Sequence, residues 1–575
     1  MSPLDGAEGN GFEPSDLYTH TGSAGSAFSA AVERSLWKFR ARIEAALYGN
    51  PLYPFFLVGK TPRRLEATPA DPWPGDRKRG EAILDRAFPF LGVTVRADPS
   101  PWQVEADPRW LAELHGFAWL RDLRAIGSDA ARRRARELVV GWVEANRAWH
   151  PIGWRADVLG TRLASWVSHG EFLCASAEDR FRKSFLAALG RQVRHLLRTA
   201  PGILPGPARI AVAKGLIYAG AALPTQERAL QAGLHLLERE LPRQVHPDGG
   251  HVSRSPAVQL TMLRDLAEIR LLLHAMHREV PNALQTAMDR LGVLLRFFRH
   301  GDGRLALFNG ACEEEGWLID MVLTRAEVLG NPPRSAPYSG FERLRAGRTL
   351  VLFDTGVPAS VPPGNQQPHA GTLSFEMSSG KERLVVNCGA YVGGQEEWRE
   401  IIRSTAAHST VTVDDKNSSQ IASDGKVRRR PSQVLCRRDE RDGNVWVEGG
   451  HDGYRAPLGL IHRRRLYLAA NGEDLRGEDR LEGLGGSRFD VRFHLHPGVS
   501  ASLAQDGFTV LLRLPKGEGW KFHAIGGDIH LEKSVYLGER GKMQRSEQIV
   551  VSGMLAESAA CVKWAFRRLP TQKPA

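Results

Sequence analysis

The apolar residues of this 575-residue chain change their spacing once, near residue 335, and this change constrains the fold more than any other feature of the sequence. Upstream, they recur at steps of three and four, as in the segment 176–198, which places them on one face of a helix. Downstream, apolar and polar residues alternate, as at 410–413 and 491–496, which is typical of half-buried strands. The sequence therefore predicts a helical half followed by an all-β half.

Three regions follow from these patterns. Residues 1–30 are rich in Gly, Ser and Ala without periodicity, which indicates a flexible N-terminal segment. Residues 31–335 hold successive amphipathic segments separated by short turns, as expected of helical hairpins stacked side by side. Residues 336–575 contain many short alternating runs punctuated by Gly, Asp and Pro, which predicts an antiparallel sandwich or barrel-like sheet. The predicted fold class is α+β with two folded domains.

Lysine and arginine outnumber aspartate and glutamate by 77 to 65, a formal net charge of +12 that is compatible with phosphate, nucleic acid or an acidic glycan as partner. The basic runs lie in different elements and are not interleaved with aromatic residues that would stack on bases. These runs are Arg132–Arg134, Arg428–Arg430 and Arg463–Arg465. We interpret each run as a solvated face and expect no nucleic-acid binding.

The cysteines and the apolar runs exclude further classes of protein. The five cysteines form no CxxC pair, so neither a disulfide framework nor a thiolate zinc site is indicated. No stretch approaches the about 18 uninterrupted apolar residues of a transmembrane helix, and residues 1–16 show no export signal. We therefore expect no membrane-spanning segment.

Three separate blocks in the second half, in a fixed order and spacing, carry a specific resemblance. They are Gln367–Glu376 (QPHAGTLSFE), Arg383–Tyr391 (RLVVNCGAY) and Arg403–Val413 (RSTAAHSTVTV). Two upstream blocks, Lys214–Gly220 and Pro247–Pro256, extend the match over residues 105–500. Together they resemble the heparinase II/III family of polysaccharide lyases. The resemblance implies an incomplete α/α toroid packed on an antiparallel β-sandwich, with an acidic, uronate-containing polysaccharide in the cleft between them.

Lyases of this family act by β-elimination: the uronate carboxylate is neutralised, a base removes the C5 proton, and an acid protonates the leaving oxygen. Family members usually carry an Asn-His pair and a Tyr in the helical domain and a His in the sandwich. In this sequence these places fall on Pro207, Ala208, Val258 and Gln367. Pro, Ala and Val cannot exchange protons, and Gln at best donates a hydrogen bond. The usual catalytic set is therefore absent.

If catalysis persists, neighbouring residues must supply it. His251, Arg254 and Tyr391 are the candidate catalytic residues, because an Arg can clamp a carboxylate while a His or Tyr moves a proton. The alternatives are that His251 bonds backbone groups and that Tyr391 packs at the edge of the core. The candidate substrate-binding residues are Gln367, Arg403 and, as a platform for a sugar ring, Trp398.

The resemblance also bears on zinc, which family members frequently hold in the sandwich through two His and one Asp. The matching residues are His369, His408 and Asn387, so both imidazoles are kept while the carboxylate has become an amide. A neutral amide oxygen is a weaker zinc ligand than a carboxylate. Zinc is one hypothesis for this cluster, and a hydrogen-bonded group that joins three strands is the alternative. A further pair, His494 and His496, shares one face of a strand and is expected to be solvated.

Two functions remain open. The first is a lyase homologue that cleaves an acidic polysaccharide by β-elimination, and the second is a catalytically degenerate glycan-binding protein on the same fold. The missing acid and base groups favour binding, whereas a compact cluster of His251, Arg254, Tyr391 and His369 facing one groove would favour lysis. The resemblance implies the cell envelope, and the lack of a visible export signal favours the cytoplasm. The sequence gives no indication of the oligomeric state.

Overall fold

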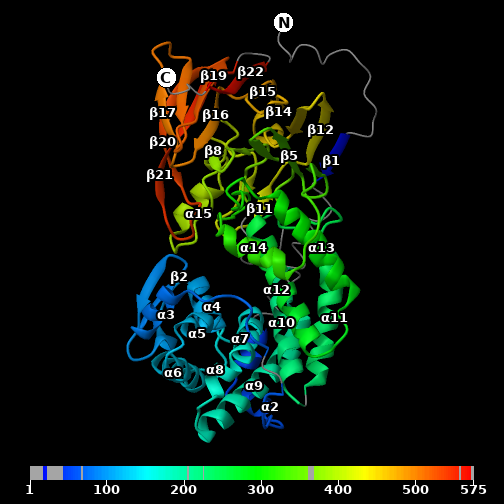
Figure 1. The fold of residues 1–575 in the computed structure, drawn as a ribbon, viewed down its shortest axis with the longest axis vertical. Coiled ribbons are helices and arrows are strands. Elements are labelled where there is room, and N and C mark those ends of the chain that lie inside the picture. The colour runs from blue at the N-terminus through cyan, green and yellow to red at the C-terminus, as the bar shows by residue number, and fades with distance from the viewer. Residues whose placement is uncertain are drawn as a thin grey trace.

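The computed structural model describes residues 17–21, 43–66, 69–203, 206–224, 226–359, 368–555 and 559–570. Helices fill the first half and antiparallel strands the second, which confirms the predicted fold class (Figure 1). The last helix of the first half ends at Arg325, and the first strand of the second half begins at Ser335. Within the described ranges, no helix is long and apolar enough to cross a membrane.

The helical half consists of helices joined by short turns and of one small hairpin, β2 (Ala87–Phe90) with β3 (Val93–Arg96). The helices are α2 (Tyr53–Phe56), α3 (Arg77–Leu84), α4 (Pro108–Gly116), α5 (Leu120–Ile126), α6 (Asp129–Ala145), α7 (Ala156–Ser168), α8 (Gly170–Cys174), α9 (Asp179–Thr199), α10 (Pro207–Ala222), α11 (Glu227–Gln244), α12 (Pro256–Ala275), α13 (Asn282–Phe297) and α14 (Gly316–Arg325). The apolar stripe predicted within 176–198 forms the buried face of α9.

Helix α10 lies between α7, α11 and α12, and most of its residues are buried (Figure 1). A Cβ atom on Gly215 would lie 2.5 Å from the Cα of Gly160 in α7, so the two helices cross at a distance that only glycine allows. The neighbouring Lys214 bonds Asp265 at 2.7 Å and Glu268 at 2.6 Å, both in α12. The block Lys214–Gly220 therefore fixes helix packing.

The second half is a sandwich of two antiparallel sheets, each of nine strands among the described residues. One sheet has the order β1 (Leu17–Thr21), β12 (Gln433–Arg441), β13 (Asn444–His451), β14 (Leu460–Leu468), β15 (Asp474–Gly483), β22 (Ala559–Arg568), β19 (Gly519–Ile525), β18 (Thr509–Arg513) and β17 (Ser500–Leu503). The other has the order β20 (Asp528–Tyr536), β21 (Gln544–Met554), β16 (Arg488–Leu495), β8 (Glu382–Val386), β7 (Phe375–Ser379), β6 (Thr349–Asp354), β5 (Phe341–Ala346) and β4 (Ser335–Ala336), with β9 (Val411–Val413) paired to β16.

Smaller elements lie beside the two sheets of the sandwich. They are α15 (Glu396–Arg403), α16 (Arg455–Leu458) and the short hairpin of β10 (Gln420–Ile421) with β11 (Val427–Arg429). The turn of helix at Thr405–Ala407 follows α15 directly. The carbonyl oxygen of Ala406 in this turn lies 2.9 Å from Nε2 of His494 in β16.

Strand β1 comes from the segment 1–30, which was expected to be flexible. It pairs antiparallel with β12, and the Tyr18 hydroxyl donates to Glu342 Oε1 at 2.8 Å and lies 3.0 Å from Thr355 Oγ1. The expectation is therefore wrong for residues 17–21, because the backbone groups along the edge of β12 offer a strand partner that needs no apolar periodicity. The rest of 1–30 lies outside the described residues.

The two halves share part of a hydrophobic core. The apolar cluster that fills the helical half also contains Phe341, Leu350 and Leu352 from β5 and β6. A second cluster fills the space between the two sheets. Because β5 and β6 contribute to both clusters, burial of apolar surface fixes the helical half against the sandwich.

Candidate functional site

Three of the four positions at which the resemblance places the lyases' catalytic residues lie at two helix starts. Pro207 and Ala208 open α10, and Val258 lies in the first turn of α12. All three side chains lack a group that exchanges protons. Gln367, the fourth place, lies outside the described residues. The three described places offer neither a base nor an acid to a bound sugar.

His251 lies just before α12 and is buried, with 1% of its surface exposed. Its Nδ1 accepts hydrogen bonds from the Ser253 amide at 3.1 Å and from the Ser253 hydroxyl at 2.7 Å. The proton is therefore on Nε2, which points to Gln244 Oε1 at 3.4 Å. Burial, with a smaller effect of His246, lowers the pKa of His251 to about 3. The imidazole is neutral and fully occupied by contacts within the chain.

Arg254 joins the helical half to the sandwich. Its guanidinium donates to the carbonyl oxygens of Ser339 at 2.7 Å, Gly340 at 2.9 Å and Val357 at 3.2 Å, and it forms an ion pair with Asp354. The group also lies 4.6 Å from the centre of the Phe341 ring. All three side-chain nitrogens of this buried arginine have partners in the sandwich, so its observed contacts are those of a structural residue.

Tyr391, Trp398 and Arg403 lie on or near α15. The rings of Tyr391 and Trp398 are half-buried, with centres 6.3 Å apart, and the Tyr391 hydroxyl makes one long bond of 3.4 Å to Gln395. Arg403 is buried and donates to the carbonyl oxygens of Ala422 and Ser423. The structure thus pairs Tyr391 with Trp398 and places Arg403 at the end of the same helix.

His369 and His408 form a buried dyad. His408 Nδ1 lies 2.7 Å from the carbonyl oxygen of Ser404, which can only accept, so this nitrogen carries the proton. The other nitrogen of His408, Nε2, then accepts from His369 Nδ1 at 3.0 Å. Burial lowers the pKa of His408 to about 4 and, together with the neighbouring His408, holds the pKa of His369 well below its ordinary value. Both rings are therefore neutral near pH 7.

Asn387, the third residue of the zinc hypothesis, bonds other groups. Its Oδ1 accepts from the Ser409 amide at 3.0 Å, and its Nδ2 donates to Glu376 at 3.3 Å. Across the described part of the chain, no group of three or more His, Cys, Asp or Glu is placed to hold a metal ion. Two imidazoles without an anionic ligand do not fit a three-ligand zinc site. Zinc occupancy stays a prediction, and the contacts seen are those of a hydrogen-bonded cluster.

The candidate catalytic residues fall into separate groups. His251 and Arg254 lie before α12, His369 bonds His408, and Tyr391 lies against Trp398. Among the described residues, no hydrogen bond or ion pair joins one group to another. These contacts give no support to a rebuilt catalytic cluster.

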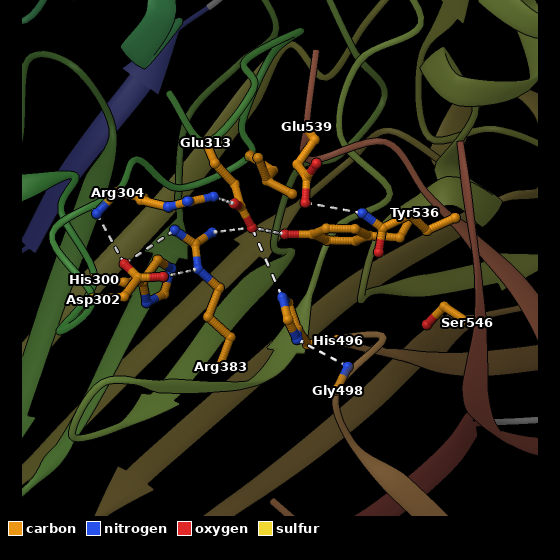
Figure 2. A network of polar contacts seen from close by, with 12 residues as sticks. His300, Asp302, Arg304, Glu313, Arg383, His496, Gly498, Tyr536, Glu539 and Ser546 are labelled. Atoms are coloured by element: carbon orange, nitrogen blue, oxygen red, sulfur yellow. Dashed lines mark hydrogen bonds and ion pairs between the residues drawn. The ribbon is translucent and has the colours of Figure 1, made fainter. Parts of the chain in front are cut away.

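A polar network that the sequence did not reveal lies at the junction of the two halves (Figure 2). At its centre is Glu313, between α13 and α14, whose Oε2 accepts from Arg304 at 2.7 Å. Its Oε1 accepts from the Tyr536 hydroxyl and lies 3.7 Å from Arg383 Nη1. His496 follows β16, with Nε2 3.8 Å from Glu313 Oε1 and its ring 5.1 Å from that of Tyr536. We refer to these five residues and Asp302 as the Glu313 network.

The charges of the Glu313 network stabilise one another. Burial alone would raise the pKa of Glu313, but Arg383, Tyr536 and Arg304 together hold it below its usual range. Asp302, which accepts from Arg383 at 2.8 Å, has its pKa lowered to about 2, because the arginine outweighs the effect of burial. Burial raises the pKa of Tyr536 well above its ordinary value and lowers that of His496. Near pH 7 the phenol is a hydrogen-bond donor, and the network joins the halves.

The histidine pair His494 and His496 gave a sequence signal near this network, and the expectation that both are solvated is wrong for His494. His494 is 3% exposed, with Nδ1 2.8 Å from Ser534 Oγ and Nε2 2.9 Å from the carbonyl oxygen of Ala406. It is buried because β16 is an inner strand that the segment after α15 covers. His496 lies beyond the end of the strand and is partly exposed.

Comparison with known proteins places the fold. Residues 329–565 match the family model "Heparinase II/III-like, C-terminal". The chain is also 33% identical over 563 residues to FtsZ-localized protein C of Caulobacter vibrioides, which covers 93% of this chain and 96% of that protein. The chain belongs to the heparinase II/III-like family.

Other family relatives are more distant. A heparin-sulfate lyase of Bacteroides stercoris is 22% identical over 413 residues, covering 65% of this chain and 58% of that protein. A solved structure of heparinase III has a TM-score of 0.72 at 15% identity, covering 93% of this chain and 91% of that one. The heparan sulfate lyase HepC of Pedobacter heparinus, solved as a mutant, has a TM-score of 0.61 at 17% identity, covering 96% and 90%. These structures share the toroid-plus-sandwich fold.

Proposed function

We propose that this chain is a catalytically degenerate member of the heparinase II/III-like family that works by binding a partner. The observation that carries the proposal is the state of the residues nearest to the family's catalytic places. Pro207, Ala208 and Val258 hold no titratable group, and His251 and Arg254 are buried in contacts with the chain itself. The leading alternative, a lyase acting on a uronate polymer, requires groups that these residues do not offer.

The chemistry of β-elimination determines which groups a lyase site must contain. A base must take a weakly acidic proton near the operating pH, and a cation must contact the uronate carboxylate. His251, with a pKa of about 3 and 1% exposure, is a weak base out of reach of a substrate. Arg254 already neutralises Asp354, and a uronate would have to displace that carboxylate. Of the three candidate catalytic residues, Tyr391 is the one that is partly exposed, and its hydroxyl donates a hydrogen bond to the neutral side chain of Gln395.

The relative named FtsZ-localized protein C supports a proposal about where a binding function operates. It matches this chain over nearly the full length of both proteins, at higher identity than the heparin-sulfate lyase. We infer that this chain also localises with FtsZ, and that the cytoplasm is favoured over the cell envelope. A second candidate for what the chain binds, besides a partner at FtsZ, is an acidic polysaccharide held between the toroid and the sandwich. The family domain at 329–565 favours this candidate.

A paired assay tests the proposal. The purified chain and an active heparinase III are incubated with acidic polysaccharides, and the ultraviolet-absorbing unsaturated product is followed. We expect product from the heparinase and none from this chain. Unsaturated product that disappears in Tyr391→Phe would contradict the proposal. A fluorescent fusion, observed with and without FtsZ, tests localisation, and an even distribution that ignores FtsZ would contradict that part alone.

A further inference from the structure

A cavity of about 590 Å³ lies where turns of the helical half and of the sandwich meet, apart from every residue considered for catalysis. Three glycine-containing turns form its wall: 299–303 after α13, 345–348 between β5 and β6, and 380–381 between β7 and β8. A Cβ atom on Gly301 would lie 1.7 Å from the carbonyl oxygen of Gly380, so the two halves touch backbone to backbone here. The cavity is therefore built jointly by both halves.

Positive charge dominates the wall of this cavity, which we call the basic pocket. Its cationic side chains are Arg296, Arg299, Arg343, Arg345, Arg348 and Lys381. Two of them have a carboxylate partner: Arg299 lies 2.7 Å from Asp320, and Arg348 lies 3.8 Å from Glu518. Two cations are thus at least partly neutralised.

The other four cations of the basic pocket have no ion-pair partner among the described residues. Arg296 donates to the carbonyl oxygens of Val328 and Gly330, and Arg343 donates to that of Phe297 at 3.2 Å. Arg345 and Lys381 are exposed and have no bonding partner for their side chains in the described part of the chain. The pocket therefore carries a surplus of about four positive charges at neutral pH.

This surplus has an electrostatic cost that an anion would remove. Burial and, next to it, the charge of Arg345 lower the pKa of Arg343 to about 10. Crowded cations repel one another, and they are stabilised when a bound anion stands between them. In the nearby Glu313 network the carboxylates of Glu313 and Asp302 are such anions. In the basic pocket, no carboxylate of the described residues pairs with the four remaining cations.

We propose that the basic pocket binds a small molecule that carries two or three neighbouring phosphate groups. A single phosphate monoester brings about 1.5 to 2 negative charges near pH 7 and each group in a linked chain brings fewer, so two or three neighbouring groups supply on the order of four charges, which balances the surplus. Guanidinium groups bind phosphate oxygens through two parallel N–H bonds. A cavity of this volume lies within the range of small-molecule sites.

The remaining wall of the pocket narrows the class of ligand. Among the described residues that line it, none is Phe, Tyr or Trp, so no platform is present for stacking a base or a sugar ring. The imidazole of His300 is already bonded to Ser378 and Glu376. Recognition therefore rests on the phosphate groups, and inorganic tripolyphosphate is the simplest probe.

The test measures tripolyphosphate binding to the full chain by calorimetry and by thermal unfolding. We expect saturable binding with a higher unfolding temperature, because a ligand that binds the folded state stabilises it. In the variant Arg345→Ala/Lys381→Ala, affinity should fall at least about tenfold, since two charge-assisted contacts are lost. Arg133→Ala/Lys183→Ala removes the same charge from exposed sites on α6 and α9 and should bind as the wild type does.

Several outcomes would overturn the proposal. These are absence of binding to the wild type at low salt, equal loss in the pocket and control variants, and orthophosphate or sulfate binding as tightly as tripolyphosphate. Retention on vesicles with a bisphosphorylated lipid headgroup, without binding of free tripolyphosphate, would replace the soluble ligand by a headgroup. The proposal is independent of the loss of lyase activity, so failure of one leaves the other standing.

Discussion

The helical half meets the sandwich at the Glu313 network and at the basic pocket, and the two places handle arginine differently. In the network, Arg304 and Arg383 each lie against carboxylates, and Arg383 is almost completely buried. In the pocket, Arg343 and Arg345 have no carboxylate partner among the described residues.

The difference follows from access to water. A buried guanidinium without a counter-ion or neutral hydrogen-bond partners would cost several kcal/mol, and in the Glu313 network the chain supplies carboxylates to its arginines. At the open pocket, water solvates the cations in part, and the charges stay available to a ligand. We therefore regard the paired charges of Arg254, Arg304 and Arg383 as stabilising the fold, and the unpaired charges of the pocket as a binding surface.

The largest expected effect is the loss of a paired charge. Arg254→Ala removes the partner of the buried Asp354 and should lower the free energy of unfolding by about 3–5 kcal/mol. Denaturant titration measures this value. Arg77→Ala, which breaks an exposed pair with Glu81, should cost less than about 0.5 kcal/mol. An Arg254→Ala protein as stable as the control would show that the contact between the halves does not depend on this pair.

The second effect concerns pH and the Glu313 network. Asp302 titrates near pH 2 in the folded chain against an ordinary value of 3.8, so its ionised form stabilises the fold above pH 3.8. That contribution, about 2 kcal/mol, is lost as the pH falls toward 2. Asp302→Asn should therefore be less stable than the wild type at pH 6 and converge with it at about pH 2. A constant difference across this range would contradict the assignment.

The third effect concerns the contribution of the unpaired cations of the basic pocket to the stability of the fold. Arg345→Ala/Lys381→Ala should change the free energy of unfolding by no more than about 0.5 kcal/mol, because both side chains are exposed and unpaired. The same double variant should bind tripolyphosphate at least about tenfold more weakly than the wild type. A large destabilisation, measured beside Arg133→Ala/Lys183→Ala, would mean that these cations serve the fold.

The smallest effect is expected at the His369–His408 dyad. If it is a hydrogen-bonded cluster, as its contacts indicate, the unfolding temperature should be the same with and without a zinc chelator. Elemental analysis of the purified chain is the direct measurement. Zinc in a 1:1 ratio, with a lower unfolding temperature in chelator, would restore the metal hypothesis.

The sequence predicted the parts of this protein that depend on short-range patterns. The change of period near residue 335 predicted helices before strands, and the apolar stripe within 176–198 became the buried face of α9. The blocks Gln367–Glu376, Arg383–Tyr391 and Arg403–Val413 indicated the family, which the match over residues 329–565 confirms. Such signals are readable because side-chain spacing alone decides which face of an element is buried.

The tertiary structure decided what the charged residues do. Arg254, named from the sequence as a catalytic candidate, bonds Asp354 from 100 positions away, and Tyr536 bonds Glu313 from 223 positions away. His494, expected in water, is covered by the segment after α15. No local pattern carries this information, because whether a charge is paired, buried or free depends on which distant segments the fold brings beside it.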